Sequence, residues 1–114
     1  MIEVIEIIKL FSNETRARIL FLISNTEVCN CDIENVLNIT QSNVSKHLKQ
    51  AEFLKLVNKR KNSYWTYYSL NQEMLKRYSF IKEILKELSK IDPFKNDLRN
   101  LREYLKNPGR CERR

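Results

Sequence analysis

Apolar residues recur every three or four positions along most of the chain, which predicts a protein built mainly from helices. Residues 2–11 carry apolar side chains at 2, 5 and 8 and at 4, 7 and 11, and this spacing predicts a first helix. Ser12 or Asn13 is expected to cap a second helix that runs to about Ile23, because short polar side chains accept hydrogen bonds from the free amides at a helix start.

The next two amphipathic segments are separated by a short turn. Residues 32–37 predict a short helix, and residues 41–54 predict a longer one that Thr40 or Ser42 would cap. Two helices joined in this way form a helix-turn-helix unit. The second helix is polar and basic on its outer face, which suits insertion into the major groove of DNA.

The pattern then changes to that of a β-hairpin. Residues 56–61 and 64–70 predict its two strands, because the second run is rich in aromatic and β-branched side chains. Asn62 and Ser63 are expected to form the turn, with three basic residues near the tip: Lys59, Arg60 and Lys61. Helix, turn, helix and basic hairpin, in this order, predict a winged helix-turn-helix fold that is mainly α.

Helical spacing returns after the hairpin. Residues 72–90 predict one long helix with a heptad seam, made of Met74, Tyr78, Ile81, Leu85 and Leu88. Such a seam needs a partner helix, and we expect a homodimer formed through this helix and the apolar first helix. A last helix over residues 94–105 completes an expected DNA-binding and dimerisation domain of residues 1–106, and residues 107–114 are expected to form a flexible basic tail that carries Cys111.

The composition fits one small domain. The chain has 114 residues, of which 42% are hydrophobic and 31% charged, the balance of a globular protein. Its longest apolar run is too short to cross a membrane and no signal peptide is recognisable, so we expect a cytoplasmic protein with no membrane partner. In that compartment the three cysteines are expected to be thiols or metal ligands rather than structural disulfides. One histidine, isolated carboxylates and no cofactor motif give no basis for an enzyme.

Positive charge is concentrated in the middle of the chain. The net charge is +7, and residues 45–77 hold eight basic against two acidic side chains. A basic block of this kind indicates a polyanionic partner, most often nucleic acid, although a solvated lysine-rich surface has the same composition.

Three motifs resemble the ArsR family of metal-sensing transcriptional repressors. Residues 26–33, TEVCNCDI, resemble the family's Glu-Leu-Cys-Val-Cys-Asp-Leu box. Residues 41–48, QSNVSKHL, resemble its recognition helix, and residues 59–70, KRKNSYWTYYSL, resemble its wing. The resemblance spans residues 5–90 and implies a homodimeric repressor that leaves double-stranded operator DNA when a soft metal or metalloid ion binds.

The chain departs from the family pattern at several positions. Lys55 and the pair Asn62 and Ser63 stand where the family commonly has glycine, and Glu34 stands where some members have a third box cysteine. Residues 72–90 contain no histidine, which excludes the family's second, zinc-type site on that helix.

The resemblance and the exposed positions of the two elements assign candidate DNA contacts. Amide and hydroxyl side chains read base edges, and lysine and arginine contact bases or phosphates. The candidates are Gln41, Ser42, Asn43, Ser45, Lys46 and Lys49 on the helix and Lys59, Arg60 and Lys61 on the wing. His47 is expected to pack inside rather than bind metal, and most of the wing's aromatic side chains are expected to join the core.

The cysteines are the candidate metal ligands. Cys29 and Cys31 lie at the start of a predicted helix, where thiolates are favoured. Arsenite or antimonite is satisfied by three thiolates, and Cys111 is the one further cysteine, from the same chain or from the dimer partner. The expected inducer is therefore As(III), Sb(III) or another thiophilic ion, with no other cofactor required.

Two further hypotheses stay open. The thiols could sense redox state by oxidation, without a metal inducer. Alternatively, the winged helix could be an adaptor that binds RNA or protein instead of DNA.

Overall fold

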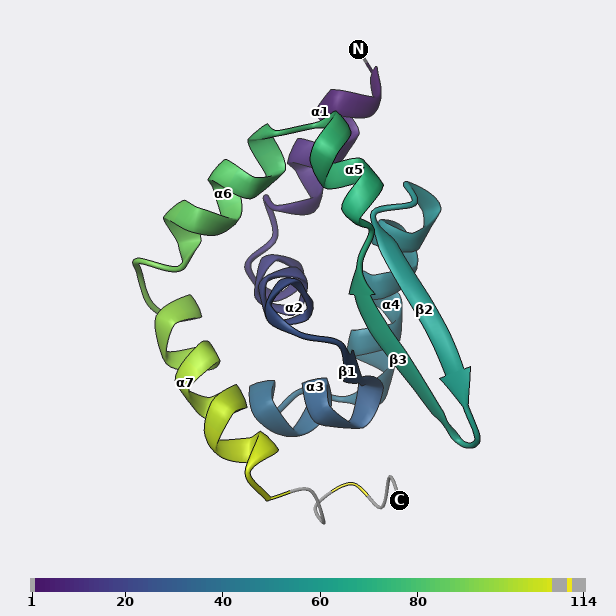
Figure 1. The fold of residues 1–114 in the computed structure, drawn as a ribbon, viewed down its shortest axis with the longest axis vertical. Coiled ribbons are helices and arrows are strands. Elements are labelled where there is room, and N and C mark those ends of the chain that lie inside the picture. Colours follow the sequence, from purple (N-terminus) through teal and green to yellow (C-terminus); the bar gives the residue numbers. More distant parts are fainter. Residues whose placement is uncertain (1, 108–110, 112–114) are drawn as a thin grey trace.

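The computed structural model describes residues 2–107 and residue 111 (Figure 1). Its elements are α1 (Ile2–Leu10), α2 (Glu14–Asn25), β1 (Val28–Cys29), α3 (Asn30–Leu37), α4 (Gln41–Phe53), β2 (Val57–Asn62), β3 (Trp65–Leu70), α5 (Gln72–Arg77), α6 (Phe80–Leu88) and α7 (Phe94–Leu105). Helix α2 runs through the centre, and the other helices and the sheet surround it (Figure 1). The fold is the mainly α winged helix-turn-helix that the sequence predicts.

The central position of α2 follows from its sequence. Six of its residues are buried, on nearly every side of the helix: Ala17, Ile19, Leu20, Phe21, Leu22 and Ile23. A helix that is apolar nearly all round can only be stable when other elements cover it. Asn13 caps its start as predicted, since the side-chain oxygen accepts a hydrogen bond of 2.9 Å from the Arg16 amide.

The helix-turn-helix unit is formed by α3 and α4. Helix α3 ends at Asn38, whose left-handed conformation (φ 56°) reverses the chain. Thr40 then caps α4, because its hydroxyl accepts a hydrogen bond of 3.2 Å from the Asn43 amide. The two predicted helices and their turn are therefore confirmed.

The sheet has three antiparallel strands in the order β1-β3-β2. Asn62 pairs with Trp65, so the turn is formed by Ser63 and Tyr64, one residue later than predicted. Ser63 has a φ of 61°, the left-handed region that the turn needs. Strand β1 was not predicted, because a strand of two residues is too short to show alternation. Its main chain pairs with the middle of β3.

The prediction of one long helix over residues 72–90 is wrong. The chain leaves the helical conformation at Tyr78 (φ −122°, ψ 83°), so α5 and α6 are separate helices. The Tyr78 hydroxyl instead hydrogen-bonds Glu3 of α1. Met74, Ile81 and Leu85 of the predicted dimer seam are buried within this chain, so the seam covers the protein's own core.

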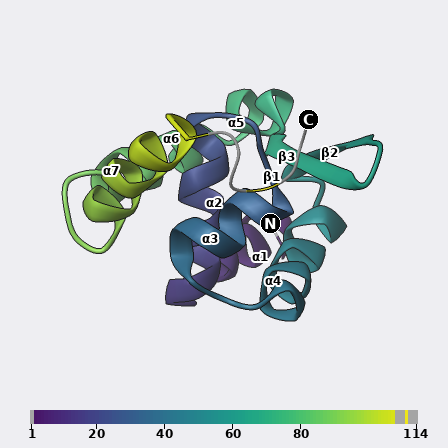
Figure 2. The same ribbon diagram turned by 90° about the horizontal axis from the view of Figure 1, so that it is seen from below.

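Helix α7 packs against α2 and α3, on the side opposite the projecting hairpin (Figure 2). The rings of Phe21 and Phe94 meet edge to face with their centroids 5.8 Å apart. Arg18 on α2 donates two hydrogen bonds of 2.8 Å to the buried Asp97 carboxylate. These contacts bring the end of α7 towards the start of α3. In the described part of the chain, no helix has the length and apolar character needed to cross a membrane.

Candidate functional site

Helix α4 presents a continuous polar face to solvent. All six residues predicted to contact DNA from this helix are exposed: Gln41, Ser42, Asn43, Ser45, Lys46 and Lys49. Val44, Leu48 and Ala51 hold the opposite face in the core. The helix can therefore enter a groove without losing its packing against α2 and α3.

The three basic residues of the wing differ in whether they contact acidic side chains. Lys59 lies 3.1 Å from the Glu52 carboxylate at the end of α4. The Arg60 guanidinium donates to both carboxylate oxygens of Glu27, at 2.7 and 3.1 Å, and this contact lowers the pKa of Glu27. Lys61 is exposed next to the turn. Two of the three predicted phosphate contacts are thus engaged with acidic side chains in this structure.

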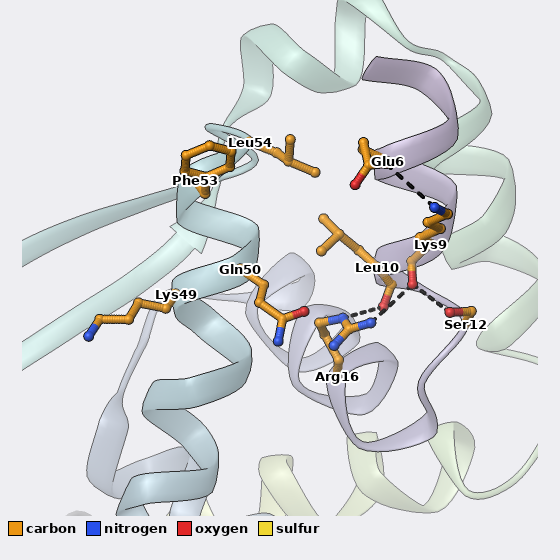
Figure 3. A pocket seen from close by; sticks show the side chains of 9 residues that line it. All are labelled: Glu6, Lys9, Leu10, Ser12, Arg16, Lys49, Gln50, Phe53 and Leu54. Atoms are coloured by element: carbon orange, nitrogen blue, oxygen red, sulfur yellow. Dashed lines mark hydrogen bonds and ion pairs between the residues drawn. The ribbon is translucent and has the colours of Figure 1, made fainter. Parts of the chain in front are cut away.

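A cleft of about 770 Å³ lies between α1 and the second half of α4 (Figure 3). Lys49 and Gln50 line it from α4, and Arg16 lies at its base. The Arg16 guanidinium donates to the Leu10 carbonyl at 2.8 Å and to the Lys9 carbonyl at 3.1 Å. Arg16 therefore caps the carboxyl end of α1 beside α4.

His47 is directed inward from α4, as expected from its position beside Leu48. It is buried, and its Nδ1 lies 3.4 Å from Nη1 of Arg16. Burial lowers the pKa of His47, and the positive charges of Arg16 and Lys46 lower it further. The environment therefore disfavours the charged imidazolium, and the contact with Arg16 connects α4 to the cap of α1.

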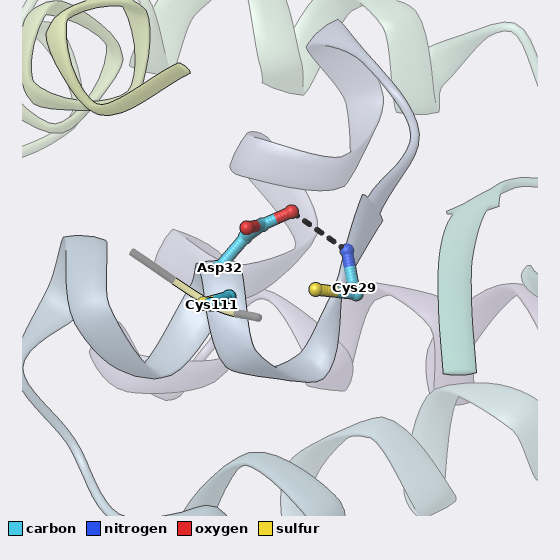
Figure 4. A group of neighbouring side chains, drawn as sticks. All are labelled: Cys29, Asp32 and Cys111. Carbon is cyan, nitrogen blue, oxygen red and sulfur yellow. Dashed lines mark hydrogen bonds between the residues drawn. The ribbon is translucent and has the colours of Figure 1, made fainter. Parts of the chain in front are cut away.

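Cys29 and Asp32 are the centre of the cysteine site. Cys29 is the N-cap of α3, and its amide donates a hydrogen bond of 3.0 Å to the Asp32 carboxylate (Figure 4). The Sγ atoms of Cys29 and Cys111 and a carboxylate oxygen of Asp32 all lie within 4.8 Å of one another, and the three residues are buried. Sequence reasoning missed Asp32, although an acidic residue three positions after an N-cap is the pattern of a capping box.

Cys31 and Cys111 are joined by a disulfide, with their Cα atoms 6.1 Å apart. This differs from the prediction that the cysteines are not in disulfides; the α7 contacts bring Cys111 to α3. Asn35 donates to both sulfurs at 3.3 Å, and the Tyr104 hydroxyl contacts the Cys111 sulfur. The other residues of the predicted tail beyond 107 lie outside the described residues, so the boundary at 106 stays a prediction.

The place of Cys29 at a helix start favours a thiolate, but the surroundings of its side chain act against this. Burial raises the pKa of the Cys29 thiol, and the negative charge of Asp32 raises it further. Hydrogen bonds from the amides of Cys31 and Asp32 act in the opposite direction, but they are weaker than the effect of burial. The local environment thus favours a neutral thiol, which must lose its proton to bind a soft ion.

Two relatives found by sequence comparison are both named as regulators of arsenic resistance. Over 73 residues, the chain is 37% identical to the arsenical resistance operon repressor of Staphylococcus xylosus, a match that covers 64% of this chain and 70% of that protein. It is also 37% identical over 70 residues to the arsenic resistance transcriptional regulator ArsR2 of Pseudomonas putida. That match covers 60% of this chain and spans only 61% of the relative's length.

Solved structures agree on the fold. Reduced HlyU from Vibrio cholerae superposes with a TM-score of 0.67, over 80% of this chain and 90% of that one, at 24% identity. Residues 13–59, which run from the N-cap of α2 into the first strand of the wing, match the family described as bacterial regulatory protein, arsR family. The chain therefore belongs to the arsR family of bacterial regulatory proteins.

Proposed function

We propose that this protein is a transcriptional repressor that binds operator DNA and leaves it when a thiophilic ion, such as arsenite or antimonite, binds its cysteines. The exposed polar face of α4, beside a basic wing, supports the DNA-binding part of the proposal. Amide, hydroxyl and lysine side chains on such a face can contact both base edges and phosphates. The relatives named as arsenical resistance repressors support the choice of inducer.

The repressor acts as a homodimer in this proposal. Ile5 and Ile8 on α1 are 48% and 44% exposed and lie one turn apart on the same face. A second copy that covers this face would place two α4 helices in successive major grooves, about one turn of DNA apart. Because Met74, Ile81 and Leu85 of the predicted seam are buried within this chain, we assign the larger part of this interface to α1.

One observation carries the choice of sensing site: Cys111, which is 80 positions away in the sequence from Cys31, meets Cys29 and Cys31 at the first turn of α3. Three sulfur donors are the set that a trivalent arsenic or antimony ion prefers, and soft ions select thiolates in general. The donor set fits such an ion when Cys31 and Cys111 are reduced. Cys29, Cys31 and Cys111 would hold it.

The position of this site suggests how DNA is released. Helix α3 packs against α4, so a change in the first turn of α3 is transmitted to the recognition helix through packed side chains. Strand β1, which ends at Cys29, also pairs with β3, the strand of the wing that lies at the centre of the sheet. An ion that binds the DNA-incompetent conformation more tightly by a few kcal/mol is sufficient to shift the population.

The disulfide favours a second candidate function, thiol-redox sensing. In this reading the Cys31 and Cys111 thiols lose two protons and two electrons to an oxidant such as hydrogen peroxide, which becomes water, and a disulfide forms. Cys29 takes no part in this reaction. Both candidate functions use Cys31 and Cys111, so Cys29, which only the metalloid site needs, distinguishes them.

The test begins with selection of duplex DNA from a random library by the reduced wild-type protein. Binding to the selected duplex is then followed by fluorescence anisotropy during titration with arsenite or with peroxide. Two variants, Cys29→Ala and Cys111→Ser, are compared with wild type. Circular dichroism shows whether each variant keeps its helices.

The outcomes separate the hypotheses. Metalloid sensing predicts that Cys29→Ala loses the arsenite response, and that Cys111→Ser weakens arsenite binding. Redox sensing predicts that Cys29→Ala keeps the full peroxide response and that Cys111→Ser loses it. If the wild-type protein shows no preference for the selected duplex over random DNA at moderate salt, the repressor proposal is wrong and the adaptor hypothesis gains support.

A further inference from the structure

The contact between Arg60 and Glu27 joins the wing to the segment that leads into the cysteine site. Both guanidinium hydrogen bonds go to the one carboxylate, a bidentate geometry that holds arginine more firmly than a single contact does. The guanidinium carbon also lies 4.6 Å from the centre of the Tyr67 ring. Arg60 is therefore held in one orientation by two neighbours, although it lies on the surface.

The sheet explains why these residues meet. Tyr67 on β3 pairs with Arg60 on one side and with Cys29 on the other, so the three residues form one row across the sheet. Glu27 lies two residues before Cys29, just outside β1. The acidic partner of the wing's arginine thus comes from the cysteine segment, while the partner of Lys59 comes from α4.

In a DNA-binding protein, a phosphate of the DNA is a second possible partner for Arg60 on the wing. A DNA phosphate offers the same bidentate acceptor geometry as a carboxylate. Both anions cannot occupy the guanidinium fully at once, and the negative charge of Glu27 would repel a phosphate close to it. Glu27 therefore opposes the contact that the wing would otherwise make with DNA.

We propose that Glu27 is an intramolecular competitor of DNA for Arg60, so that the segment leading to Cys29 limits the positive charge that the wing offers to phosphates. The inference rests on the proposed DNA-binding function and deepens it. It assigns a role to an acidic side chain, which itself has no positive charge to offer to a phosphate.

The test measures dissociation constants for the selected duplex at one fixed salt concentration, with reductant present. The variants are Glu27→Gln, Arg60→Ala and the double variant. Glu27→Gln is expected to bind about two- to fivefold more tightly than wild type, the range that corresponds to an exposed ion pair. In the Arg60→Ala background the same substitution is expected to give a clearly smaller gain, because only the repulsion between Glu27 and nearby phosphates is then removed. A merely structural role for Glu27 would give weaker binding instead.

Glu52→Gln is the matched control, because it removes the same charge from the neighbouring ion pair with Lys59. Whatever its effect on binding, that effect is expected to persist in the Arg60→Ala background. Unchanged or weaker binding by Glu27→Gln overturns the inference, as does a gain of equal size in the Arg60→Ala background. Absence of duplex binding by the wild type overturns the proposed function as well, so the two failures are distinguishable.

Discussion

The ion pair between Arg18 and Asp97 fixes α7 to the core. Removing Arg18 should lower the free energy of unfolding more than removing Asp97. The Asp97 side chain is 2% exposed, whereas that of Arg18 is 26% exposed. Arg18→Ala leaves a buried carboxylate without its cation, which costs about 3–5 kcal/mol. Asp97→Ala leaves a guanidinium that can still reach water, so we expect a loss of about 1–2 kcal/mol.

Urea unfolding at pH 7 with reductant measures both free energies by linear extrapolation. The variant that lacks both side chains should be more stable than Arg18→Ala alone, because no buried charge is left unpaired. Equal losses for the two single variants would refute this reasoning, as would a double variant less stable than Arg18→Ala. Should Arg18→Ala be too unstable to measure, the order of the wild type, Asp97→Ala and the double variant still tests the asymmetry.

Three further predictions concern single side chains. Lys55 has a φ of 61°, so Lys55→Gly should raise the unfolding free energy by about 0.5–1 kcal/mol and Tm by about 2–4 °C; an unchanged or lower Tm in calorimetry contradicts this. Burial lowers the folded-state pKa of His47, so the urea midpoint of unfolding should fall as the pH drops below the unfolded-state pKa of about 6.5. His47→Gln should show a smaller fall. An equal fall in both proteins would contradict the view that His47 causes it. Arg60 lowers the pKa of Glu27, so NMR titration should find this pKa back in its ordinary range in Arg60→Ala. In the wild type, the stabilisation from the ion pair should be lost as the pH falls through the folded-state pKa of Glu27.

Local signals in the sequence were sufficient to predict the helices, the turn and the hairpin of the winged helix-turn-helix. Asn13 and Thr40 act as caps with partners three residues away, and helical spacing alone identified the buried face of α4. A hairpin is likewise a contact between neighbours in sequence. The candidate DNA contacts on α4 could therefore be placed before the fold was known.

The remaining features depend on contacts between distant residues. Strand β1 forms because Val28 and Cys29 pair with Tyr68 and Tyr67 of β3, which are about 40 positions away in the sequence. Heptad spacing singled out Met74, Ile81 and Leu85, which are buried, but it does not show whether they face this chain's own core or a partner. Spacing also does not show whether the backbone is continuous through Tyr78. The proximity of Cys111 to Cys31 rests on the packing of α7, which no local pattern reveals.

The covalent link between Cys31 and Cys111 also affects how long the protein would survive in a cell. It closes a loop across 80 positions that contains the recognition helix, the wing and α5 to α7. In the chain-entropy description, a loop of this size destabilises the unfolded state by about 4.5 kcal/mol. Proteases act on unfolded molecules, so the bridged form would be degraded more slowly than the reduced form. The redox state of two sulfur atoms would then influence how much of the protein a cell retains.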